Sequence, residues 1–400
     1  MSSILENRKI LLCVSSGIAI YKTVELVSTL RKSGADIRII LTPNAKKMIS
    51  KMVFSAVGNC AVYTEMFDIN DGWIPHTDLS SWADLLIVAP ATANTIAKIN
   101  NGIADNLLLS ACLAYTGKKM IVPTMNIRMY ENIATQKNLK ELQEKNWKVL
   151  EPGFGHLACG DIGPGRYPEN EVIVQNIEFS LSKKWLENYN VLVTAGPTRE
   201  KIDSVRYISN RSSGKMGYAV AKAFRYAGST VNLVSGPVEI EPPAEVKMTK
   251  VETTEEMGEA VDELAKNADI IVMTAAVSDY SPENPVSYKI KKSKEKFVVD
   301  MARTRDIIST INRKKGSILV GFCAEDSEIE EKALQKLRNK NLDIVFANDI
   351  SKEGIGFDSE YNELLMITKD GTKENLPRLS KDELSLMVVK QIVNYIKKIK

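Results

Sequence analysis

Residues 9–22 read KILLCVSSGIAIYK, an apolar run that passes through two serines and a glycine into a more polar stretch. The run Lys9–Ser16 is typical of a buried strand. A helix of about 15 residues is predicted to follow and to end at Ser33 and Gly34, because glycine favours helix termination. A strand, a short turn of small residues and a helix form the repeating unit of an α/β fold.

The same alternation continues through the first half of the chain. Asp36–Thr42 (DIRIILT), Asp84–Ala91 (DLLIVAPA) and Lys119–Met125 (KMIVPTM) are further apolar runs, and Pro43 opens a second helix. Unbroken apolar runs are typical of strands that a parallel sheet buries on both faces. Repeated strand–helix–strand units predict a doubly wound sheet, which binds ligands at the carboxyl ends of its strands.

The segment at residues 151–170 breaks this pattern. It reads EPGFGHLACGDIGPGRYPEN and contains five glycines and three prolines. This composition argues against a helix and against a regular strand interior, so we expect a long loop. Loops of this length in compact domains are usually functional or mobile.

A second series of units begins after a helical stretch that ends near Glu187. Asn190–Gly196 (NVLVTAG) is its predicted first strand, and SSGKMGYAVAKAFRYAG leads into a helix that Gly228 closes. Four more strand-then-loop units follow, namely TVNLVSGP, ADIIVMTAA, SILVGFCAE and LDIVFAND, and an amphipathic helix over Ser380–Lys400 ends the chain. We predict an α/β protein with two doubly wound parallel-sheet domains, residues 1–188 and 189–400, with the boundary near residues 185–190.

Composition narrows the classes of function. The 400 residues suggest two or three domains, and 53 Lys and Arg against 50 Asp and Glu leave a net charge of +3. This balance argues against a general nucleic-acid binder, and 44% hydrophobic residues argue against a disordered chain. Five scattered cysteines without a CxxC pair argue against disulfides and a cysteine zinc site. The sequence shows neither a signal-peptide-like segment nor an apolar stretch of 18 residues. We therefore expect a cytoplasmic protein that does not bind membranes.

Two segments at predicted strand ends are candidate ligand sites. In Ser15–Ala19, backbone N–H groups and the positive end of a helix dipole would suit a phosphate, although an ordinary βα turn has the same appearance. In Pro90–Thr95, small side chains would admit a flat ring and hydroxyl groups would bind it. The alternative is that an Asn or Thr of this segment caps the next helix.

Histidine and cysteine supply further candidates. The chain has only two histidines, His76 and His156, and His156 lies three residues before Cys159. Such a Cys–His pair suggests nucleophilic catalysis or a metal ligand, but the segment offers only Asp161 and Glu169 as further metal ligands.

The second half holds two charged segments of interest. Ser209–Lys215 is not a P-loop, because Ser209 stands where glycine is required and Met216 where Ser or Thr is required. The lysine-rich segment Lys289–Lys294 is either a solvated face or, together with Asp279, a site for a triphosphate.

Taken in order, these motifs resemble the bifunctional phosphopantothenoylcysteine decarboxylase / phosphopantothenate–cysteine ligase family of coenzyme A biosynthesis, from residue 8 to about residue 398. The first half carries SGIAIYK (16–22), His76, PATANTIAK (90–98), PTMNIRMY (123–130) and LACGDIGPGR (157–166). The second half carries TAGPTREKID (194–203), ISNRSSGKMG (208–217), AAVSDY (275–280), KIKK (289–292), GFCAE (321–325) and ANDI (347–350). The resemblance implies a flavodoxin-like or Rossmann-like flavoprotein domain followed by a Rossmann-like ligase domain.

For the first half, the resemblance implies an FMN-dependent decarboxylase. His76 would act at the decarboxylation step, Asn126 would bind the substrate carboxylate, and Cys159 would protonate the enethiol intermediate. His156 receives no role. The residues implied in FMN binding are Ser16, Gly17, Thr42, Pro90, Ala91, Thr92 and Asn94.

For the second half, the resemblance implies that 4′-phosphopantothenate and CTP form an acyl-cytidylate, from which cysteine displaces CMP. Asn210 would stabilise this intermediate, and Lys289 would contact the nucleotide phosphates. Attack of a carboxylate on a phosphate brings like charges together, so the step requires cations and Mg²⁺, whose ligands the sequence does not identify. The other residues implied in CTP binding are Ala275, Asp279, Thr304, Arg305, Asp306, Ile307, Phe322, Lys336 and Lys340.

Two departures from the family pattern are conservative, namely Tyr130 in place of Trp and Cys323 in place of Ala. The resemblance also implies a homo-oligomer, a dodecamer of decarboxylase trimers and ligase dimers, with an FMN site between protomers. Other readings are a flavin prenyltransferase-like protein with a degenerate second half, a flavin-binding regulatory subunit, and an enzyme with one inactive half.

Overall fold

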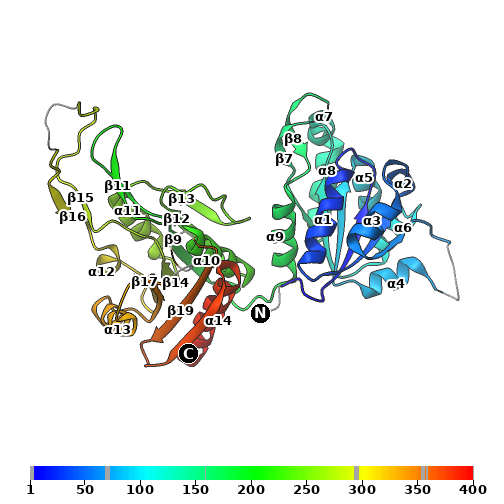
Figure 1. Ribbon diagram of the computed structural model, residues 1–400. Helices are drawn as coiled ribbons and strands as arrows, with labels where there is room; N and C mark the ends of the chain where they lie inside the picture. The colour runs from blue at the N-terminus through cyan, green and yellow to red at the C-terminus, as the bar shows by residue number, and fades with distance from the viewer. Residues whose placement is uncertain are drawn as a thin grey trace. The chain divides into compact units, whose positions relative to one another are not determined.

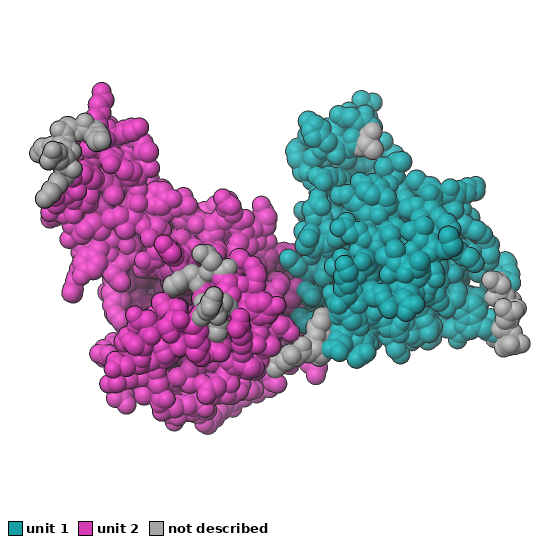
Figure 2. Space-filling view, in the orientation of Figure 1, with its two compact units in different colours: residues 1–182 teal, residues 183–400 magenta. Residues whose placement is uncertain are grey.

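The computed structural model describes residues 4–67, 73–157, 159–291, 297–352, 356 and 359–399. The chain folds into two compact units, residues 1–182 and residues 183–400 (Figure 2). Each unit has its own central sheet with helices on both faces (Figure 1). The predicted α/β class with two doubly wound domains is therefore confirmed.

A six-stranded parallel sheet with the strand order β3-β2-β1-β4-β5-β6 forms the centre of the N-terminal unit. The strand order reverses between β1 and β4, which is where open α/β sheets bind ligands. Four of these strands were predicted, and the short edge strands β3 and β6 were not. The strands are β1 (Lys9–Val14), β2 (Asp36–Leu41), β3 (Ala61–Tyr63), β4 (Leu85–Ala91), β5 (Lys118–Pro123) and β6 (Trp147–Val149).

Helices cover both faces of this sheet, which explains the unbroken apolar strands. In β1, Leu12 packs in the same cluster as α1, α3 and α9, whereas Leu11 packs with α4, α5, α6 and α8 on the other face. The helices of this unit are α1 (Ile20–Lys32), α2 (Pro43–Met48), α3 (Lys51–Gly58), α4 (Pro75–Trp82), α5 (Ala93–Asn100), α6 (Leu107–Ala114), α7 (Ile127–Glu131), α8 (Ile133–Glu144) and α9 (Asn170–Leu181).

The segment at residues 151–170 is a β-hairpin, so the expectation of an irregular loop was wrong. Strands β7 (Gly153–His156) and β8 (Ile162–Arg166) pair antiparallel, with a register shift after Gly153. Within the described part of the chain the two strands pair only with each other, and Gly155 and Gly165 adopt φ values of 150° and 121°. A separate, irregular ribbon of this kind accommodates glycine and proline that the interior of a packed sheet would not.

The C-terminal unit contains an eight-stranded sheet in the order β13-β12-β9-β14-β17-β18-β19-β20. The first six strands in this order are parallel, and β19 and β20 extend the sheet as an antiparallel hairpin that the sequence reading did not predict. These strands are β9 (Asn190–Ala195), β12 (Thr230–Ser235), β13 (Lys247–Lys250), β14 (Ile270–Met273), β17 (Ile318–Glu325), β18 (Ile344–Asp349), β19 (Tyr361–Thr368) and β20 (Lys373–Ser380).

Helices again cover the two faces separately. Helices α10 (Lys215–Tyr226) and α14 (Lys381–Ile399) pack together on one face. Helices α11 (Thr254–Ala265), α12 (Ile307–Thr310) and α13 (Ile329–Asn339) pack on the other. In the described ranges, none of the helices combines the length and the apolar character needed to span a bilayer.

Two small ribbons extend from the carboxyl edge of this sheet. One pairs β10 (Arg199–Lys201) with β11 (Tyr207–Ser209), and the other pairs β15 (Tyr280–Pro282) with β16 (Met301–Arg303). The segment between β15 and β16, here called the arm, includes Lys289. Lys292 and Lys294 of the predicted lysine-rich segment lie outside the described residues.

Candidate functional site

In the N-terminal unit, Ser15 joins the loops that follow β1 and β4. The Ser15 side chain is buried, its Oγ donates a hydrogen bond to the carbonyl oxygen of Pro90 at 2.8 Å, and it accepts one from the N–H of Thr92 at 3.1 Å. Ser16 and Gly17 are thereby held beside Pro90, Ala91 and Thr92 at the carboxyl edge of the sheet. The sequence analysis named Ser15 as the first residue of the candidate phosphate loop but assigned no role to its side chain, because two consecutive serines give no sign of which one points inward.

The helix starts at this edge differ in how they are capped. Thr42 Oγ1 accepts a hydrogen bond from Ala45 N at 3.2 Å at the start of α2, and Thr92 Oγ1 accepts one from Thr95 N at 3.3 Å at the start of α5. Thr92 is thus a helix cap, as the alternative reading of its segment expected. Within the described residues, no side chain caps α1. The N–H groups of Ile20 and Lys22 donate to the carbonyl oxygens of Gly17 at 2.9 Å and Ala19 at 3.0 Å, so an anion at this helix start would bind other N–H groups of the Ser16–Gly17 turn.

Asn126 lies where the hairpin meets the rest of the unit. Its Oδ1 accepts a hydrogen bond from Met129 N at 2.9 Å and so caps α7, while Met125 N donates to the carbonyl oxygen of Gly165 at 3.0 Å. A Cβ atom at Gly165 would overlap the Met125 carbonyl oxygen. Gly165 therefore permits the close approach that brings β8 to the segment carrying Asn126.

The remaining predicted residues of this unit lie on separate elements. Cys159 is exposed at the turn of the hairpin, with Sγ 3.5 Å from Asp161 Oδ2, and His156 is exposed on β7. His76 is half-buried on α4, and its Nδ1 has no hydrogen-bond partner among the described residues. Asn94 is exposed in the first turn of α5. In the described ranges, no three His, Cys, Asp or Glu side chains group as a metal site would require.

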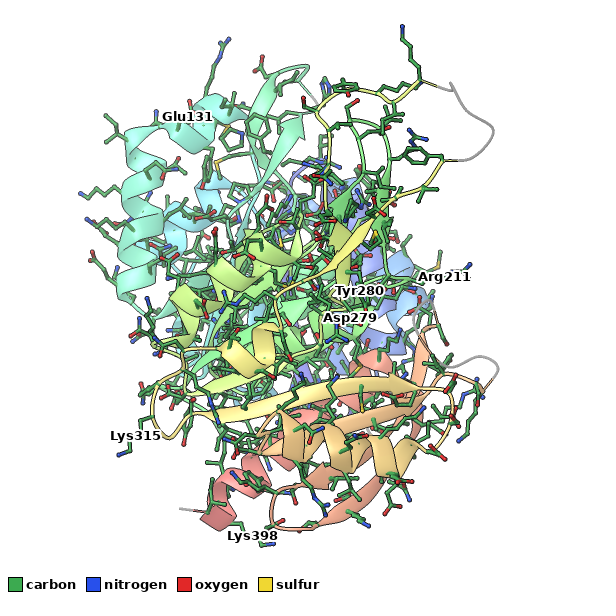
Figure 3. The ribbon with its side chains drawn as sticks, turned by 90° about the vertical axis from the view of Figure 1, so that its left-hand side faces the viewer. Glu131, Arg211, Asp279, Tyr280, Lys315 and Lys398 are labelled. Atoms are coloured by element: carbon green, nitrogen blue, oxygen red, sulfur yellow. The ribbon has the colours of Figure 1, made fainter. Side chains whose placement is uncertain are left out.

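The C-terminal unit has a cavity of about 670 Å³ at the carboxyl edge of its sheet. The segment that follows β14 passes along the cavity and leads through Asp279 and Tyr280 into the arm (Figure 3). Lys289 is exposed in the arm and is not among the described residues that line the cavity. All the other predicted nucleotide-site residues line it, namely Asn210, Ala275, Asp279, Thr304, Arg305, Asp306, Ile307, Phe322, Lys336 and Lys340.

Asn210 is tied to the backbone of the segment after β14. Its amide nitrogen donates to the carbonyl oxygens of Ala276 at 3.2 Å and Val277 at 2.9 Å. A side-chain amide has two N–H donors and an acceptor oxygen, so the loop uses both donors of Asn210.

A buried hydrogen-bond network lies behind this segment. Glu200 is buried, and its Oε1 accepts hydrogen bonds from Thr254 N at 2.9 Å and Thr254 Oγ1 at 2.7 Å. Ser278 N donates to Thr198 Oγ1 at 3.0 Å, and Thr304 Oγ1 donates to Ser278 O at 2.6 Å. These bonds fix the backbone at Ser278, directly before Asp279, and Thr304 is the one member of the network to which the sequence analysis assigned a role.

Several cations of the cavity are held by neighbouring groups. Lys340 forms an ion pair with Asp306, and Lys336 Nζ donates to the carbonyl oxygen of Phe322 at 2.7 Å. Arg305 Nη2 donates to Asp262 Oδ2 at 2.7 Å. Partial burial opposes ionisation of Asp306, but hydrogen bonds from Lys340 and Ser309 outweigh it and hold the pKa of that carboxyl below its usual value.

Further lining residues come from segments to which sequence reasoning assigned no role in the nucleotide site. They belong to the start of α10, the end of β18, the strand β19 and the start of α14. The polar members of this group are Lys215, Asn348, Asn362 and Lys381.

Comparison with known families covers both units. Residues 1–182 match the family model described as Flavoprotein, and residues 186–396 match the one described as DNA/pantothenate metabolism flavoprotein C-terminal domain.

Curated relatives match the chain from end to end. The coenzyme A biosynthesis bifunctional protein CoaBC of Bacillus subtilis (strain 168) is 42% identical over 394 residues, with 97% of each chain covered. The protein of the same name from Escherichia coli (strain K12) is 41% identical over 396 residues, again with 97% of each chain covered.

Solved structures match one unit at a time. A crystal structure of the C-terminal domain of a coenzyme A biosynthesis bifunctional protein CoaBC is 39% identical with a TM-score of 0.47, and the match covers 54% of this chain and 100% of that one. The FMN-dependent cysteine decarboxylase SpaF is 28% identical with a TM-score of 0.39, and the match covers 44% of this chain and 97% of that one.

Proposed function

This chain belongs to the family of the coenzyme A biosynthesis bifunctional proteins CoaBC, and we propose that each of its two units catalyses one of the two reactions. The chain is an enzyme with decarboxylase and ligase activities. The C-terminal unit joins 4′-phosphopantothenate to cysteine with CTP, and the N-terminal unit converts the resulting 4′-phosphopantothenoylcysteine into 4′-phosphopantetheine with FMN.

The observation that carries the ligase assignment is that the predicted nucleotide-site residues other than Lys289 line one cavity. Residues between Asn210 and Lys340, chosen from motifs spread along the chain, line a single cavity at the ligand-binding edge of an α/β sheet. A cavity of this size is typical of small-molecule sites, and its lysines suit a polyphosphate.

In the ligase reaction, a carboxylate oxygen of 4′-phosphopantothenate attacks the α-phosphorus of CTP, and diphosphate leaves. The cysteine amine then attacks the acyl carbon, and CMP leaves. Lys336 and Lys340 offset the negative charge that accumulates in the first step, and Lys289 adds a further positive charge at the nucleotide phosphates. Asn210 stabilises the intermediate by exchanging its bond to Ala276 for one to the substrate.

Asp279 fits a magnesium ion. It is an exposed carboxylate that lines the cavity, and Mg²⁺ is usually held by one or two carboxylates together with substrate phosphates. When bound, the ion neutralises phosphate charge.

The N-terminal unit fits FMN at the carboxyl edge of its sheet. The uncapped start of α1, with Ser16 and Gly17, suits the phosphate, and the Pro90–Thr92 segment with Thr42 and Asn94 supplies small and polar groups for the rest. Bound FMN supplies oxidation of the cysteinyl carbon and the later return of a hydride.

Three residues of this chain act on the substrate in the decarboxylase reaction. Asn126 binds the carboxylate through its amide nitrogen, while its oxygen caps α7. His76 assists the loss of CO2, and its buried Nδ1 lacks a hydrogen-bond partner among the described residues. Cys159 donates the proton that converts the enethiol product of decarboxylation into the saturated thiol.

We also propose a homo-oligomer, a dodecamer of decarboxylase trimers and ligase dimers. Ile18 and Tyr21, just after the phosphate loop, are 67% and 62% exposed, which suits an FMN site completed by a second protomer. A reducing compartment, the cytoplasm, is expected, because all five cysteines are free.

The test is purification of the full chain followed by an assay. The expected result is a yellow protein that makes 4′-phosphopantetheine from 4′-phosphopantothenate, cysteine and CTP. A preparation reconstituted with FMN that releases no CO2 would refute the decarboxylase assignment. Turnover with ATP and not with CTP would show that the ligase uses an adenine nucleotide and not the proposed cytidine nucleotide.

A further inference from the structure

Two lysines outside the predicted nucleotide site line the ligase cavity. Lys215 is the first residue of α10, and Lys381 is the first residue of α14. Lys381 is only 6% exposed, and its Nζ donates to the carbonyl oxygen of Gly356 at 3.0 Å. Burial of a lysine is unfavourable unless charged or polar partners stabilise it, so a buried lysine in the wall of a substrate cavity calls for an explanation.

Glu360 connects the two lysines. Its carboxylate forms an ion pair with Lys215, and its backbone carbonyl accepts a hydrogen bond from Lys381 N at 2.9 Å. The hydrogen bond and charge of Lys215, together with the charge of Lys381, hold the pKa of the Glu360 carboxyl below its usual value. Glu360 is therefore the counter-ion at this end of the cavity, and its side chain is 72% exposed.

The lysine pair reaches the cavity from a different side than the predicted lysines. Helices α10 and α14 pack on one face of the sheet, whereas α13, which contains Lys336 and is followed directly by Lys340, packs on the other. Lys340 is paired with Asp306, and Lys336 donates to the Phe322 carbonyl oxygen. A nucleoside triphosphate is long enough to need contacts at both sides, and its phosphates carry most of its charge.

We propose that Lys215 and Lys381 bind the terminal phosphates of the nucleotide used by the ligase, and that Glu360 occupies Lys215 until the nucleotide displaces it. This inference rests on the proposed ligase function. Phosphate oxygens are stronger partners for lysine than a backbone carbonyl, because both members of the pair are charged. After attack at the α-phosphate the same lysines hold the departing diphosphate, so they also stabilise the charge that develops on it.

The first test measures the ligase reaction of the full-length Lys381→Met and Lys215→Met variants. Loss of one charged phosphate contact is expected to raise the KM for CTP about tenfold and to leave the KM for cysteine unchanged. Lys222→Met is the matched control. Lys222 also bridges α10 and α14, through Asp382 at 2.8 Å, but it is not among the described residues that line the cavity.

The second test changes the counter-ion. Glu360→Gln is expected to lower the KM for CTP several-fold, because the nucleotide no longer competes with a carboxylate for Lys215. The Glu360 side chain is exposed, so the substitution should leave folding unchanged. Glu330→Gln is the control, since Glu330 is also exposed and paired, but its partner Lys373, unlike Lys215, is not among the described residues that line the cavity.

The third test uses inorganic tripolyphosphate and cytidine as probes that separate phosphate binding from base binding. Tripolyphosphate should inhibit the wild-type ligase competitively with CTP, and about tenfold less strongly in Lys381→Met and Lys215→Met. Inhibition by cytidine should be the same in all three. An equal loss for both probes, unchanged KM values in the two lysine variants, or a raised KM in Glu360→Gln would each refute the proposal. A wild-type protein without ligase activity would instead refute the proposed function.

Discussion

The amide nitrogen of Asn210 lies 2.9 Å from the carbonyl oxygen of Val277, in the segment that connects β14 to Asp279. This contact, with its companion to Ala276, joins the loop before α10 to the wall of the nucleotide cavity. Asn210 is exposed, so its bonds organise the site and contribute little buried surface to the core.

Substitution Asn210→Asp should therefore reduce ligase activity much more than stability. An ionised aspartate would face two carbonyl oxygens and could donate to neither the loop nor the substrate. We expect a loss of about 100-fold in ligase kcat, the scale seen when one donor to a charged transition state is removed. Decarboxylase activity of the same variant is the internal control, and Asn375→Asp, on exposed β20, controls for the added charge. A similar loss in Asn375→Asp would contradict the assigned role.

Substitution Ser15→Ala should weaken both stability and flavin binding. The substitution removes the hydroxyl that accepts from Thr92 N and donates to Pro90 O at a buried position. A buried polar group left without a partner lowers the free energy of unfolding by about 1–3 kcal/mol. Urea unfolding and the absorbance of retained flavin report the two effects. Ser33→Ala, which removes a hydroxyl bonded to Thr29 O at the other end of α1, should change neither by a comparable amount.

Most strands of the two parallel sheets could be predicted because a strand that is buried on both faces consists of a nearly continuous run of apolar residues. Leu11 and Leu12 both had to be apolar, since each packs in a different cluster. The hairpin of β19 and β20 left a weaker trace. Buried and more exposed residues alternate along the first part of β19, so its sequence is not a continuous apolar run. The signal that could have revealed the hairpin is the dipeptide Asp370–Gly371 at its turn, which is favoured in hairpins.

The nucleotide cavity was predicted in part for a similar reason. Asp279 follows β14 and Phe322 lies in the carboxyl-terminal half of β17, and parallel strands bring their carboxyl ends to one edge. Lys215 and Lys381 start two helices that are far apart in the sequence, and only the packing of α10 on α14 brings them to the same wall. Lys289 was assigned from its motif, and the structure leaves it outside the lining of the cavity, in the arm.

Substitution Gly165→Ala should impair the decarboxylase by moving the hairpin away from the Asn126 segment. A Cβ atom there would overlap the Met125 carbonyl oxygen, and the φ of 121° is unfavourable for alanine. We expect decarboxylase activity to fall at least about tenfold while ligase activity is unchanged. Gly102→Ala is the control, since Gly102 has a φ of 70° and open space at its Cβ position. Equal losses in the two variants would show that backbone strain alone is responsible.

Substitution Asp203→Asn should destabilise the C-terminal unit in a pH-dependent way. Asp203 is buried at the base of the arm, and hydrogen bonds from Arg206 and from the N–H groups of Val205, Arg206 and Ile290 hold the pKa of its carboxyl well below its usual value. The stabilisation is therefore complete above the unfolded-state pKa of about 3.9 and is lost as the pH falls through the folded-state pKa.

Urea unfolding of wild type and Asp203→Asn at pH 7 and pH 3 measures this dependence. The difference in unfolding free energy should be largest at pH 7 and smaller at pH 3, because at pH 3 the Asp203 carboxyl of the unfolded wild-type chain binds a proton that the folded protein does not. A difference that is independent of pH would mean that the Asp203 charge contributes nothing. The substitution should also weaken the hydrogen bond from Ile290 N to the residue 203 side chain, which holds the arm next to Lys289. Because Lys289 is proposed to act on the nucleotide, the variant should bind 4′-phosphopantothenate and CTP less well.

Substitution Cys159→Ser should separate the two halves of the decarboxylase reaction. Cys159 is exposed at the hairpin turn, and among the described residues its Sγ contacts only Asp161 Oδ2, at 3.5 Å, so its replacement should leave folding unchanged. A serine hydroxyl is a much weaker acid than a thiol, so proton donation to the enethiol should slow while loss of CO2 continues. We expect CO2 release to continue while the enethiol accumulates. Mass spectrometry of the product would detect the enethiol. Normal yields of 4′-phosphopantetheine from this variant would show that another group donates the proton, and Asp161, the contacting carboxyl, would be the next residue to replace.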